Sequence, residues 1–378
     1  MKILVLNYEY PPLGGGAGPV CRELSEHYAD RGHRVDVVTM SYAGLPSREE
    51  RGGVRIERVP SWRRRPDLCG TIEMGTYVAS ALPRVSRRLR RGAYDVVHCH
   101  FVVPTGLLAY FATRFGDAPY ILTAHGSDVP GFNPDRFRAQ HRFIGPLRNL
   151  VIRNAALLAS PSVFLSDLIH ETCGPFPIEH IPNGIDASRL RPGPKKRRIL
   201  MTGRLLPRKG FQHVLEALRG LDSHCEIHIA GDGPMRAELE EIARTLAQPV
   251  TFHGWLDHDS ATLKDLYESS AIFCLPSEKE NASISLLEAM SAGAAVVTSN
   301  GSGCSETVAD AGLQVPPRDR DALRSALSKL LESERLRSEL GERGRRRIQE
   351  HFDWRTIGDT YLEHLHRVQR IHPGRQAD

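Results

Sequence analysis

The stretch Ser277–Gly293 reads SEKENASISLLEAMSAG and follows a short apolar segment, Ala271–Leu275, which Pro276 ends. Apolar residues recur through its second half and a glycine follows them. We therefore expect a strand, a turn, and a helix that begins near Ser283 and ends at Gly293. The N–H groups at the start of a helix are free, and the helix dipole gives them partial positive charge. The small residues at this helix start would let a phosphate group approach the backbone.

Two glutamates, Glu280 and Glu288, stand eight residues apart in this stretch. Glu280 precedes the predicted helix and Glu288 lies more than one turn inside it. A rise of about 1.5 Å per residue then separates the carboxylates by roughly 8–12 Å, about the span of a diphosphate that joins a sugar to a ribose. Carboxylates accept hydrogen bonds from hydroxyl groups, so one could hold the sugar and the other the ribose. The alternative is a solvated Glu280 and a Glu288 bound to a neighbouring helix, and the two acids alone do not decide between these interpretations.

The whole context, ENASISLLEAMSAG, resembles the E-x7-E motif of retaining GT-B glycosyltransferases, the large family usually called GT4. In that family the first glutamate contacts the donor sugar and the second binds the ribose. The resemblance implies a catalytic role for Glu280 and donor binding for Glu288. It also implies that the helix start at Ser283 and Ile284 stabilises the charge of the leaving diphosphate.

Length and composition set outer limits on the protein class. A chain of 378 residues is long enough for two domains with separate cores. Its net charge of +5 is modest for this length and argues against a dedicated nucleic-acid-binding protein. The seven cysteines are scattered without a C-x-x-C pair, which favours reduced thiols in the cytoplasm over a disulfide framework or a zinc site. We expect no signal peptide or transmembrane helix, so any membrane contact would be peripheral.

The chain begins with a predicted strand, Lys2–Tyr8, followed by the glycine-rich segment YPPLGGGAG and a helix. Such a turn can bring backbone N–H groups to a phosphate. The spacing is not that of a clean G-x-G-x-x-G dinucleotide fingerprint. The segment resembles the N-terminal loop of GT4 enzymes, which implies that Gly15 and Gly16 face the donor.

Strands and helices alternate along the chain, which predicts parallel sheets with helices on both faces. Ligands then bind at the carboxyl ends of strands, and His100, His125 and Asp128 follow two such strands. His98 and His100 would share one side of a strand, but we prefer an interpretation without metal binding. The HGSD segment resembles the GT4 loop whose histidine lies beside the transferred sugar. The resemblance implies a catalytic His125, with His100 and Asp128 on the acceptor or sugar side, whereas the alternative is a loop histidine bonded to nearby backbone.

The charged, Pro/Gly-rich segment Arg189–Arg198 is typical of a linker, so we place a domain boundary there. The predicted domains are 1–190 and 191–353, with a last helix within 354–378 that crosses back to the first domain, as in GT-B proteins. Beyond the boundary, GRLLPRKG resembles the GT4 pyrophosphate-binding element, which implies catalytic roles for Arg204 and Lys209. The loop containing Leu256 is similar to one that lines the nucleotide base pocket in relatives.

Two basic clusters, Arg63–Arg65 and the arginines of 84–91, admit two interpretations. Arginines near a helix C-terminus suit the helix dipole, which favours a solvated face. A basic amphipathic helix can also dock on an anionic membrane. Because many GT4 enzymes use lipid-linked acceptors, peripheral attachment to the cytoplasmic face of a membrane is the second hypothesis.

The resemblance extends over nearly the whole chain. It implies an α/β protein of the GT-B fold, with two Rossmann-like domains and a cleft between them. The implied reaction is transfer of a sugar from a UDP- or GDP-linked donor to a glycan or lipid-linked acceptor, with retention, in surface polysaccharide or glycolipid synthesis. No metal or other cofactor and no nucleic acid is expected, and the oligomeric state is left open. The alternatives are a GT-B sugar-nucleotide epimerase, a catalytically silent GT-B binding protein and, more remotely, an NAD-dependent oxidoreductase.

Overall fold

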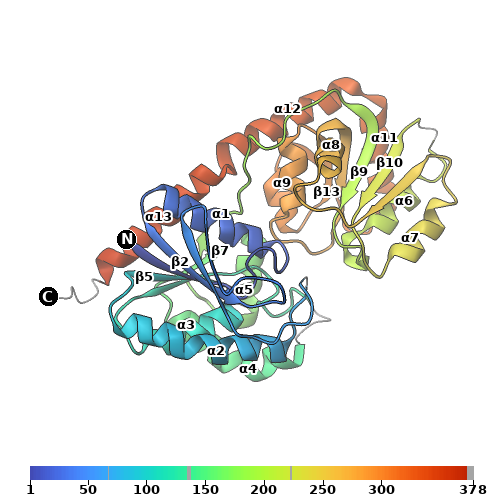
Figure 1. Cartoon of the computed structure of the whole chain (residues 1–378). Helices are drawn as coiled ribbons and strands as arrows, with labels where there is room; N and C mark the ends of the chain where they lie inside the picture. Colours follow the sequence, from blue (N-terminus) through green and yellow to red (C-terminus); the bar gives the residue numbers. More distant parts are fainter. Residues whose placement is uncertain (67, 134–137, 222–223, 373–378) are drawn as a thin grey trace. The chain divides into compact units, whose positions relative to one another are not determined.

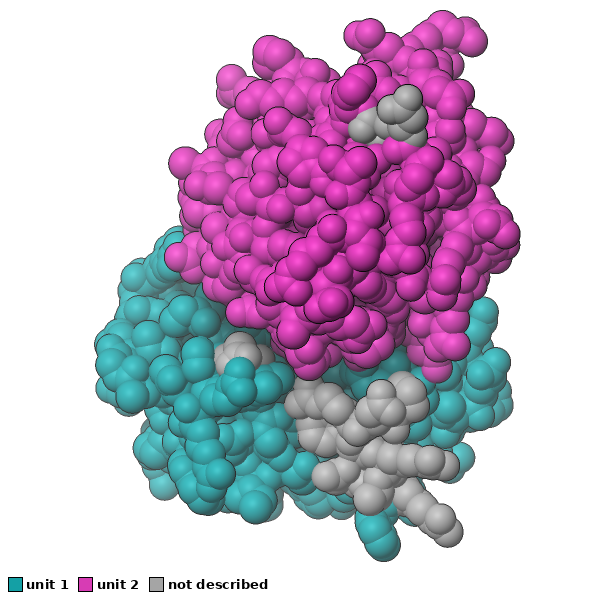
Figure 2. Space-filling model, turned by 90° about the vertical axis from the view of Figure 1, so that its right-hand side faces the viewer, with its two compact units in different colours: residues 1–183, 354–378 teal, residues 184–353 magenta. Residues whose placement is uncertain are grey.

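The computed structural model describes residues 1–66, 68–133, 138–221 and 224–372 (Figure 1). The chain forms two compact units, shown in different colours in Figure 2. The first unit comprises Met1–Asn183 together with Trp354–Asp378, and the second comprises Gly184–Asp353. This division lies at residue 183, whereas the domain boundary expected from the sequence lies at residue 190.

The first unit is built on an eight-stranded sheet with the order β3-β4-β2-β1-β5-β6-β7-β8. All neighbouring strands are parallel except β3, which pairs antiparallel with β4. The strands are β1(Lys2–Leu6), β2(Arg34–Met40), β3(Arg48–Arg51), β4(Val54–Val59), β5(Val96–His100), β6(Tyr120–Thr123), β7(Leu157–Ser160) and β8(Glu179–His180).

Helices cover both faces of the first sheet. Figure 1 shows α2, α3 and α4 together on one face, with α1 and α13 on the other. The helices are α1(Ala17–Asp30), α2(Thr71–Arg90), the short turn η1(Val102–Gly106), α3(Leu107–Thr113), α4(Arg138–Arg153), α5(Val163–Cys173) and α13(Trp354–Ile371). The last helix packs against α1 and buries Ile357, Tyr361 and Leu365. Its predicted return to the first domain is confirmed.

The second unit has a six-stranded, fully parallel sheet with the order β11-β10-β9-β12-β13-β14. Its strands are β9(Lys196–Thr202), β10(Glu226–Ala230), β11(Val250–Gly254), β12(Ser270–Leu275), β13(Ala295–Ser299) and β14(Gly312–Val315). Its helices are η2(Pro207–Lys209), α6(Phe211–Leu218), α7(Arg236–Ala243), α8(Ala261–Ser269), α9(Ile284–Ser291), α10(Gly303–Val308), α11(Arg320–Glu332) and α12(Glu334–His351).

Each unit has its own apolar core. Ile3–Leu6 of β1 and Ala271–Leu275 of β12 are continuous apolar runs, and all of these residues are buried because helices cover both faces of each sheet. The predicted class, two Rossmann-like parallel-sheet domains, is confirmed. In the described ranges, no helix is both long and apolar enough to cross a lipid bilayer.

Candidate active site

Helix α9 of the second unit follows the buried strand β12 and begins with an open N-terminus. Ser283 is its N-cap residue and has an extended backbone (φ −76°, ψ 116°), but its side chain makes no capping hydrogen bond. The Ser283 hydroxyl instead bonds the Ser285 hydroxyl at 2.9 Å. The first N–H groups of a helix have no partner within the helix, so this end of α9 can bind an anion.

Glu288 lies inside α9 with only 4% of its surface exposed. Burial raises the pKa of its carboxyl to about 7, and a hydrogen bond from Tyr267 and the nearby charge of Arg189 oppose this rise. Arg189 Nη1 lies 3.2 Å from Glu288 Oε1, and His258 Nδ1 lies 3.3 Å from the same oxygen. Glu288 is therefore a buried carboxylate with polar partners from three separate segments.

Arg189 joins the segment before β9 to the loop after β11. Its guanidinium lies 3.2 Å from Asp259 Oδ1 and also donates to the backbone carbonyl of His258. From the sequence, this arginine was expected to be part of a charged linker. Its partner Glu288 lies 99 residues further along the chain, so the pairing could not be read from the sequence.

Lys209 and Glu280 form an ion pair in the second unit. Both side chains are largely buried, with 13% and 18% of their surfaces exposed. Lys209 ends the turn η2 and precedes Gly210, which has a left-handed backbone (φ 75°). A Cβ atom on Gly210 would lie 2.5 Å from the carbonyl oxygen of Pro276, so a larger residue would push this loop away from β12.

Arg204 lies in the same loop as Lys209 and is half-buried. Within the described part of the chain, its guanidinium has no hydrogen-bonding or ionic partner in the protein. A partly buried cation in the loop that also carries a paired lysine is an arrangement that an anionic ligand can complete.

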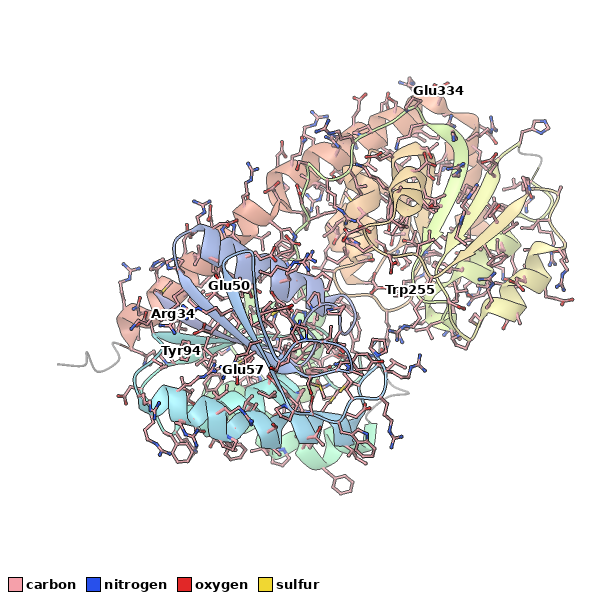
Figure 3. All side chains as sticks on the ribbon, viewed as in Figure 1. Arg34, Glu50, Glu57, Tyr94, Trp255 and Glu334 are labelled. Atoms are coloured by element: carbon pink, nitrogen blue, oxygen red, sulfur yellow. The ribbon has the colours of Figure 1, made fainter. Side chains whose placement is uncertain are left out.

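The loop after β11 carries Trp255 and Leu256. The Trp255 side chain is 69% exposed (Figure 3), whereas Leu256 packs against the core of the second unit. The structure thus fixes the backbone at Leu256, the predicted base-pocket residue, by packing its side chain inward.

In the first unit, Asp128 holds the loop after β6. It is 3% exposed, and its carboxylate accepts hydrogen bonds from the backbone N–H groups of His125 (3.0 Å), Gly126 (2.9 Å) and Val102 (2.7 Å). Burial raises the pKa of Asp128, and these hydrogen bonds oppose the rise. Among the described residues, the bonding partners of this carboxylate are backbone groups of its own unit, so the geometry gives Asp128 the role of a loop anchor.

The His125 ring lies against two residues from the end of β5. His125 Nε2 is 3.0 Å from His100 Nδ1, and the Phe101 ring centroid lies 4.7 Å from that of His125. Phe101 has φ 75°, a backbone region that residues with side chains rarely adopt. Thr105 donates to the Phe101 carbonyl at 2.8 Å, which holds the chain in this conformation. His100 itself is fully buried, behind His125.

The glycine-rich loop before α1 leaves open space at two positions. A Cβ atom on Gly15 or on Gly16 would meet no atom within 4 Å, and Gly16 begins α1 without a side-chain cap. The Gly15 N–H donates to Glu9 Oε2 at 3.2 Å. The two glycines therefore present exposed backbone, as a donor-facing loop requires.

The structure thus gathers the predicted residues into separate groups within their own units. Lys209 pairs with Glu280, and Ser283, Ile284 and Glu288 share α9. His100, His125 and Asp128 cluster at the ends of β5 and β6. Among the described residues, no set of three or more His, Cys, Asp or Glu side chains is arranged to hold a metal ion.

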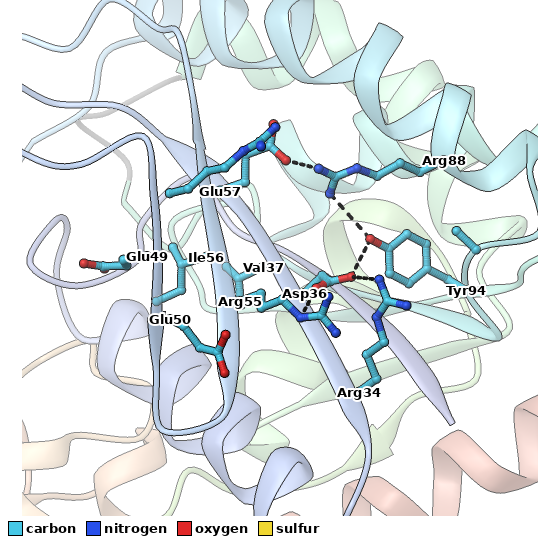
Figure 4. A pocket seen from close by; sticks show the side chains of 12 residues that line it. Arg34, Asp36, Val37, Glu49, Glu50, Arg55, Ile56, Glu57, Arg88 and Tyr94 are labelled. Atoms are coloured by element: carbon cyan, nitrogen blue, oxygen red, sulfur yellow. Dashed lines mark hydrogen bonds and ion pairs between the residues drawn. The ribbon is translucent and has the colours of Figure 1, made fainter.

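A cavity of about 500 Å³ on β2, β3 and β4 contains none of the predicted site residues (Figure 4). Its charged side chains largely neutralise one another. The Asp36 carboxylate accepts a 2.8 Å hydrogen bond from Tyr94 and lies 3.4 Å from Arg55, and Glu57 pairs with Arg88. These internal pairs argue for a structural network.

Comparison with known proteins places the chain in a family. The family model Glycosyltransferase Family 4 matches residues 14–189, and Glycosyl transferases group 1 matches residues 185–347. The glycogen synthase of Mycobacterium tuberculosis is 30% identical over 390 residues, which cover 94% of this chain and 92% of that protein.

Solved structures show the same fold at lower identity. Sucrose-phosphate synthase from Thermosynechococcus elongatus matches with a TM-score of 0.84 at 21% identity, over 98% of this chain and 100% of that one. Anabaena HepE, solved in complex with UDP and glucose, matches with a TM-score of 0.76 at 19% identity, over 97% and 99% of the two chains. The fold is that of the GT-B glycosyltransferases. Within this class, the chain belongs to the group 1 glycosyltransferases of family GT4, as the sequence resemblance predicted.

Proposed function

We propose that this glycosyltransferase moves a hexose from a UDP- or GDP-linked donor to a glycan or lipid-linked acceptor, with retention of the anomeric configuration. The observations that carry the proposal are the Lys209–Glu280 pair, the uncapped start of α9 and Arg204, whose guanidinium has no partner among the described residues. These cations and amides are suited to a diphosphate, and the two carboxylates are suited to hydroxyl groups on either side of it.

The proposed reaction depends on charge that develops during bond breaking. As the bond between sugar and diphosphate breaks, the leaving diphosphate gains negative charge. Arg204, Lys209 and the N–H groups at the start of α9 stabilise that charge in the transition state, which lowers the barrier. We assign no protein nucleophile, because the family resemblance favours attack by the acceptor on the same face of the sugar.

The ion pair between Lys209 and Glu280 suggests how these two charges are stabilised before a donor binds. Two largely buried charges are costly unless they are paired. We propose that an arriving diphosphate takes Lys209 as its partner and that Glu280 then accepts hydrogen bonds from the donor sugar. Each charge exchanges one partner for another, so neither is left buried and unpaired.

Glu288 is proposed to bind the ribose hydroxyls, and the backbone at Leu256 to contact the base. From the first unit, Gly15 and Gly16 are assigned to donor approach and His125 to orientation of the sugar. The HepE complex with UDP and glucose supports a UDP-linked donor. The glycogen synthase relative supports a glycan acceptor.

Peripheral binding to an anionic membrane is the second part of the proposal. Arg87, Arg90 and Arg91 are exposed at the end of α2, and the Arg90 guanidinium lies 5.3 Å from the ring centroid of Phe115, a half-exposed residue that follows α3. Helix α4 lies on the same face of the sheet as α2 and α3 (Figure 1). Its residue Phe143 is 84% exposed. Exposed aromatic and basic side chains on one face suit a lipid headgroup region.

The cluster Arg63–Arg65 contributes less to that surface than the sequence suggested. Arg63 is buried and donates to the backbone carbonyls of Tyr8 (3.0 Å) and Pro66 (2.9 Å). Its role is to hold the loop before α2, so the basic surface consists mainly of the α2 arginines. Anionic vesicles in a co-sedimentation assay at low salt test this part. Binding that survives Arg87→Glu together with Arg90→Glu would contradict it.

The donor is tested by a thermal-shift screen against UDP, GDP, ADP, dTDP and their common sugars. A ligand that binds only the folded state raises the melting temperature, so one nucleotide should give a clear shift. Donor hydrolysis and transfer are then measured for wild type and Glu280→Ala. Glu241→Ala on the surface of α7 is a control for loss of a glutamate side chain, because its side chain is 78% exposed. Undiminished turnover in Glu280→Ala would refute the mechanism.

A further inference from the structure

Two fully buried histidines, His98 and His100, lie side by side on β5 behind the loop that carries His125. Alternate residues of a strand point to the same face, and the two ring centroids are 4.4 Å apart. Burying two imidazoles costs free energy unless they have hydrogen-bonding partners. The hydrogen-bonding partners of His98 and His100 therefore indicate the role of these two residues.

His100 makes its contact with the loop residue His125. His100 Nδ1 and His125 Nε2 are 3.0 Å apart, and the two rings are stacked with their centroids 5.3 Å apart. Burial lowers the pKa of His125 to about 3 and holds the pKa of His100 well below its usual range. Both rings are thus neutral near pH 7, and a neutral imidazole has one N–H and one bare nitrogen. One proton therefore lies between these two nitrogens, and one ring donates it to the other.

The other nitrogen of His100 decides which ring is the donor. His100 Nε2 is buried and has no hydrogen-bond partner among the described residues. If His125 were the donor, the proton of His100 would sit on Nε2 as a buried N–H without an acceptor. Buried N–H groups without partners are rarer in proteins than acceptors that lack a donor. The arrangement with His100 Nδ1–H as donor is therefore favoured, and it leaves His125 with its proton on Nδ1.

We propose that His100 is a positioning residue that fixes His125 as the neutral tautomer protonated on Nδ1. Its effect on sugar transfer rests on the proposed function of His125, whereas the tautomer itself does not. His100 occupies Nε2 of His125, so the loop histidine can act only as a hydrogen-bond donor through Nδ1. A hydroxyl oxygen of the donor sugar is the chemical group that fits such a donor.

A second layer of hydrogen bonds holds the ring on which His100 packs. His98 Nε2 lies 2.9 Å from the Thr123 hydroxyl, which lies 3.1 Å from the Tyr361 hydroxyl of α13. On its other side, His98 Nδ1 lies 3.2 Å from the Tyr28 hydroxyl of α1. The last helix of the chain thus supports the orientation of His98, and through it the layer that contains His100.

Nitrogen NMR of histidine-labelled protein tests the tautomer without any donor or acceptor. The His125 signals are identified by their loss in His125→Gln. We expect wild-type Nδ1 to have the chemical shift of a protonated nitrogen and Nε2 that of a bare one. His100→Asn retains an N–H group near the position of Nδ1 and should keep this pattern. His100→Leu removes the donor, so the His125 signals should move toward the average of both tautomers.

Two results would overturn the proposal: a wild-type His125 protonated on Nε2, or an unchanged pattern in His100→Leu. The wild-type spectrum decides the question even if His100→Leu does not fold. Tyr361→Phe is the matched control, since it removes one hydroxyl of the second layer and leaves the contact between His100 and His125 intact. Once a donor is known, His100→Leu should lower kcat roughly tenfold at unchanged donor KM, and His100→Asn should restore it. If no donor is turned over, the proposed function fails while the tautomer assignment stands on the spectra.

Discussion

Replacing Glu288 with glutamine is expected to make the folded protein more stable at neutral and alkaline pH. Burial raises the pKa of Glu288 from its ordinary value of 4.5 to about 7. Between these two pH values the folded state holds a proton that the unfolded chain has released. Stability therefore falls as the pH rises through this interval, because the unfolded state binds fewer protons there than the folded state. Glutamine is neutral at every pH and keeps an oxygen that can accept from Arg189.

The size of the effect follows from the same two values. One pH unit corresponds to about 1.4 kcal/mol, so the interval from 4.5 to about 7 corresponds to about 3 kcal/mol in favour of Glu288→Gln above pH 7. A change of 1 kcal/mol shifts the melting temperature of a domain of 150–250 residues by about 2–4 °C. The melting temperature of the second unit should therefore rise by about 6–12 °C at pH 8.

Scanning calorimetry of wild type and Glu288→Gln at pH 4 and pH 8 measures this difference. At pH 4 both proteins carry a neutral group at position 288, so the comparison there reports only the change in packing. The gain should grow between the two pH values, while donor binding by the variant is lost. An equal difference at both pH values would refute the argument that burial raises the pKa of Glu288. Functional sites commonly lower the stability of the fold that carries them.

Four further predictions concern the proposed donor site. Only the ionised form of Glu288 can accept hydrogen bonds from both ribose hydroxyls, so donor affinity should fall about tenfold per pH unit below about pH 7; a flat profile in calorimetric titrations between pH 5.5 and 8.5 would contradict this. Lys209→Met should lower kcat by about 10²–10³-fold, because it removes a fixed positive charge that stabilises the leaving diphosphate. An unchanged kcat in steady-state transfer assays would contradict this. Gly210→Ala should lower the melting temperature by several degrees, because its Cβ would lie 2.5 Å from the Pro276 carbonyl oxygen. Gly16 has open space around it, so Gly16→Ala should keep the wild-type melting temperature but bind donor more weakly. Equal melting temperatures for Gly16→Ala and Gly210→Ala would show that the close contact at Gly210 does not limit stability.

The sequence predicted most of the elements that carry the site. Of the predicted strand Lys2–Tyr8, residues Lys2–Leu6 form β1. The apolar segment before Pro276 lies in β12, and the helix expected near Ser283 begins at Ile284. These predictions succeed because periodicity and capping depend on residues close together in the chain. The motifs at the carboxyl ends of the strands indicated the family, and the comparisons confirm it.

The partners of the buried polar groups were not predicted. Arg189, taken as a linker cation, pairs with Glu288. His100, expected on the acceptor or sugar side, is fully buried and bonds His125. The Tyr361 hydroxyl of the last helix lies 3.1 Å from the Thr123 hydroxyl, 238 residues earlier in the chain.

The sequence by itself determined the βα rhythm, the glycine-rich and basic loops, and hence the family. Each of these features is encoded by neighbouring residues whose spacing sets the local backbone. Only the tertiary structure showed that Arg189 faces Glu288, that His100 contacts His125 and that Arg63 is buried. A buried polar group must find a partner wherever the packed elements place one, and that choice depends on contacts between segments far apart in the sequence.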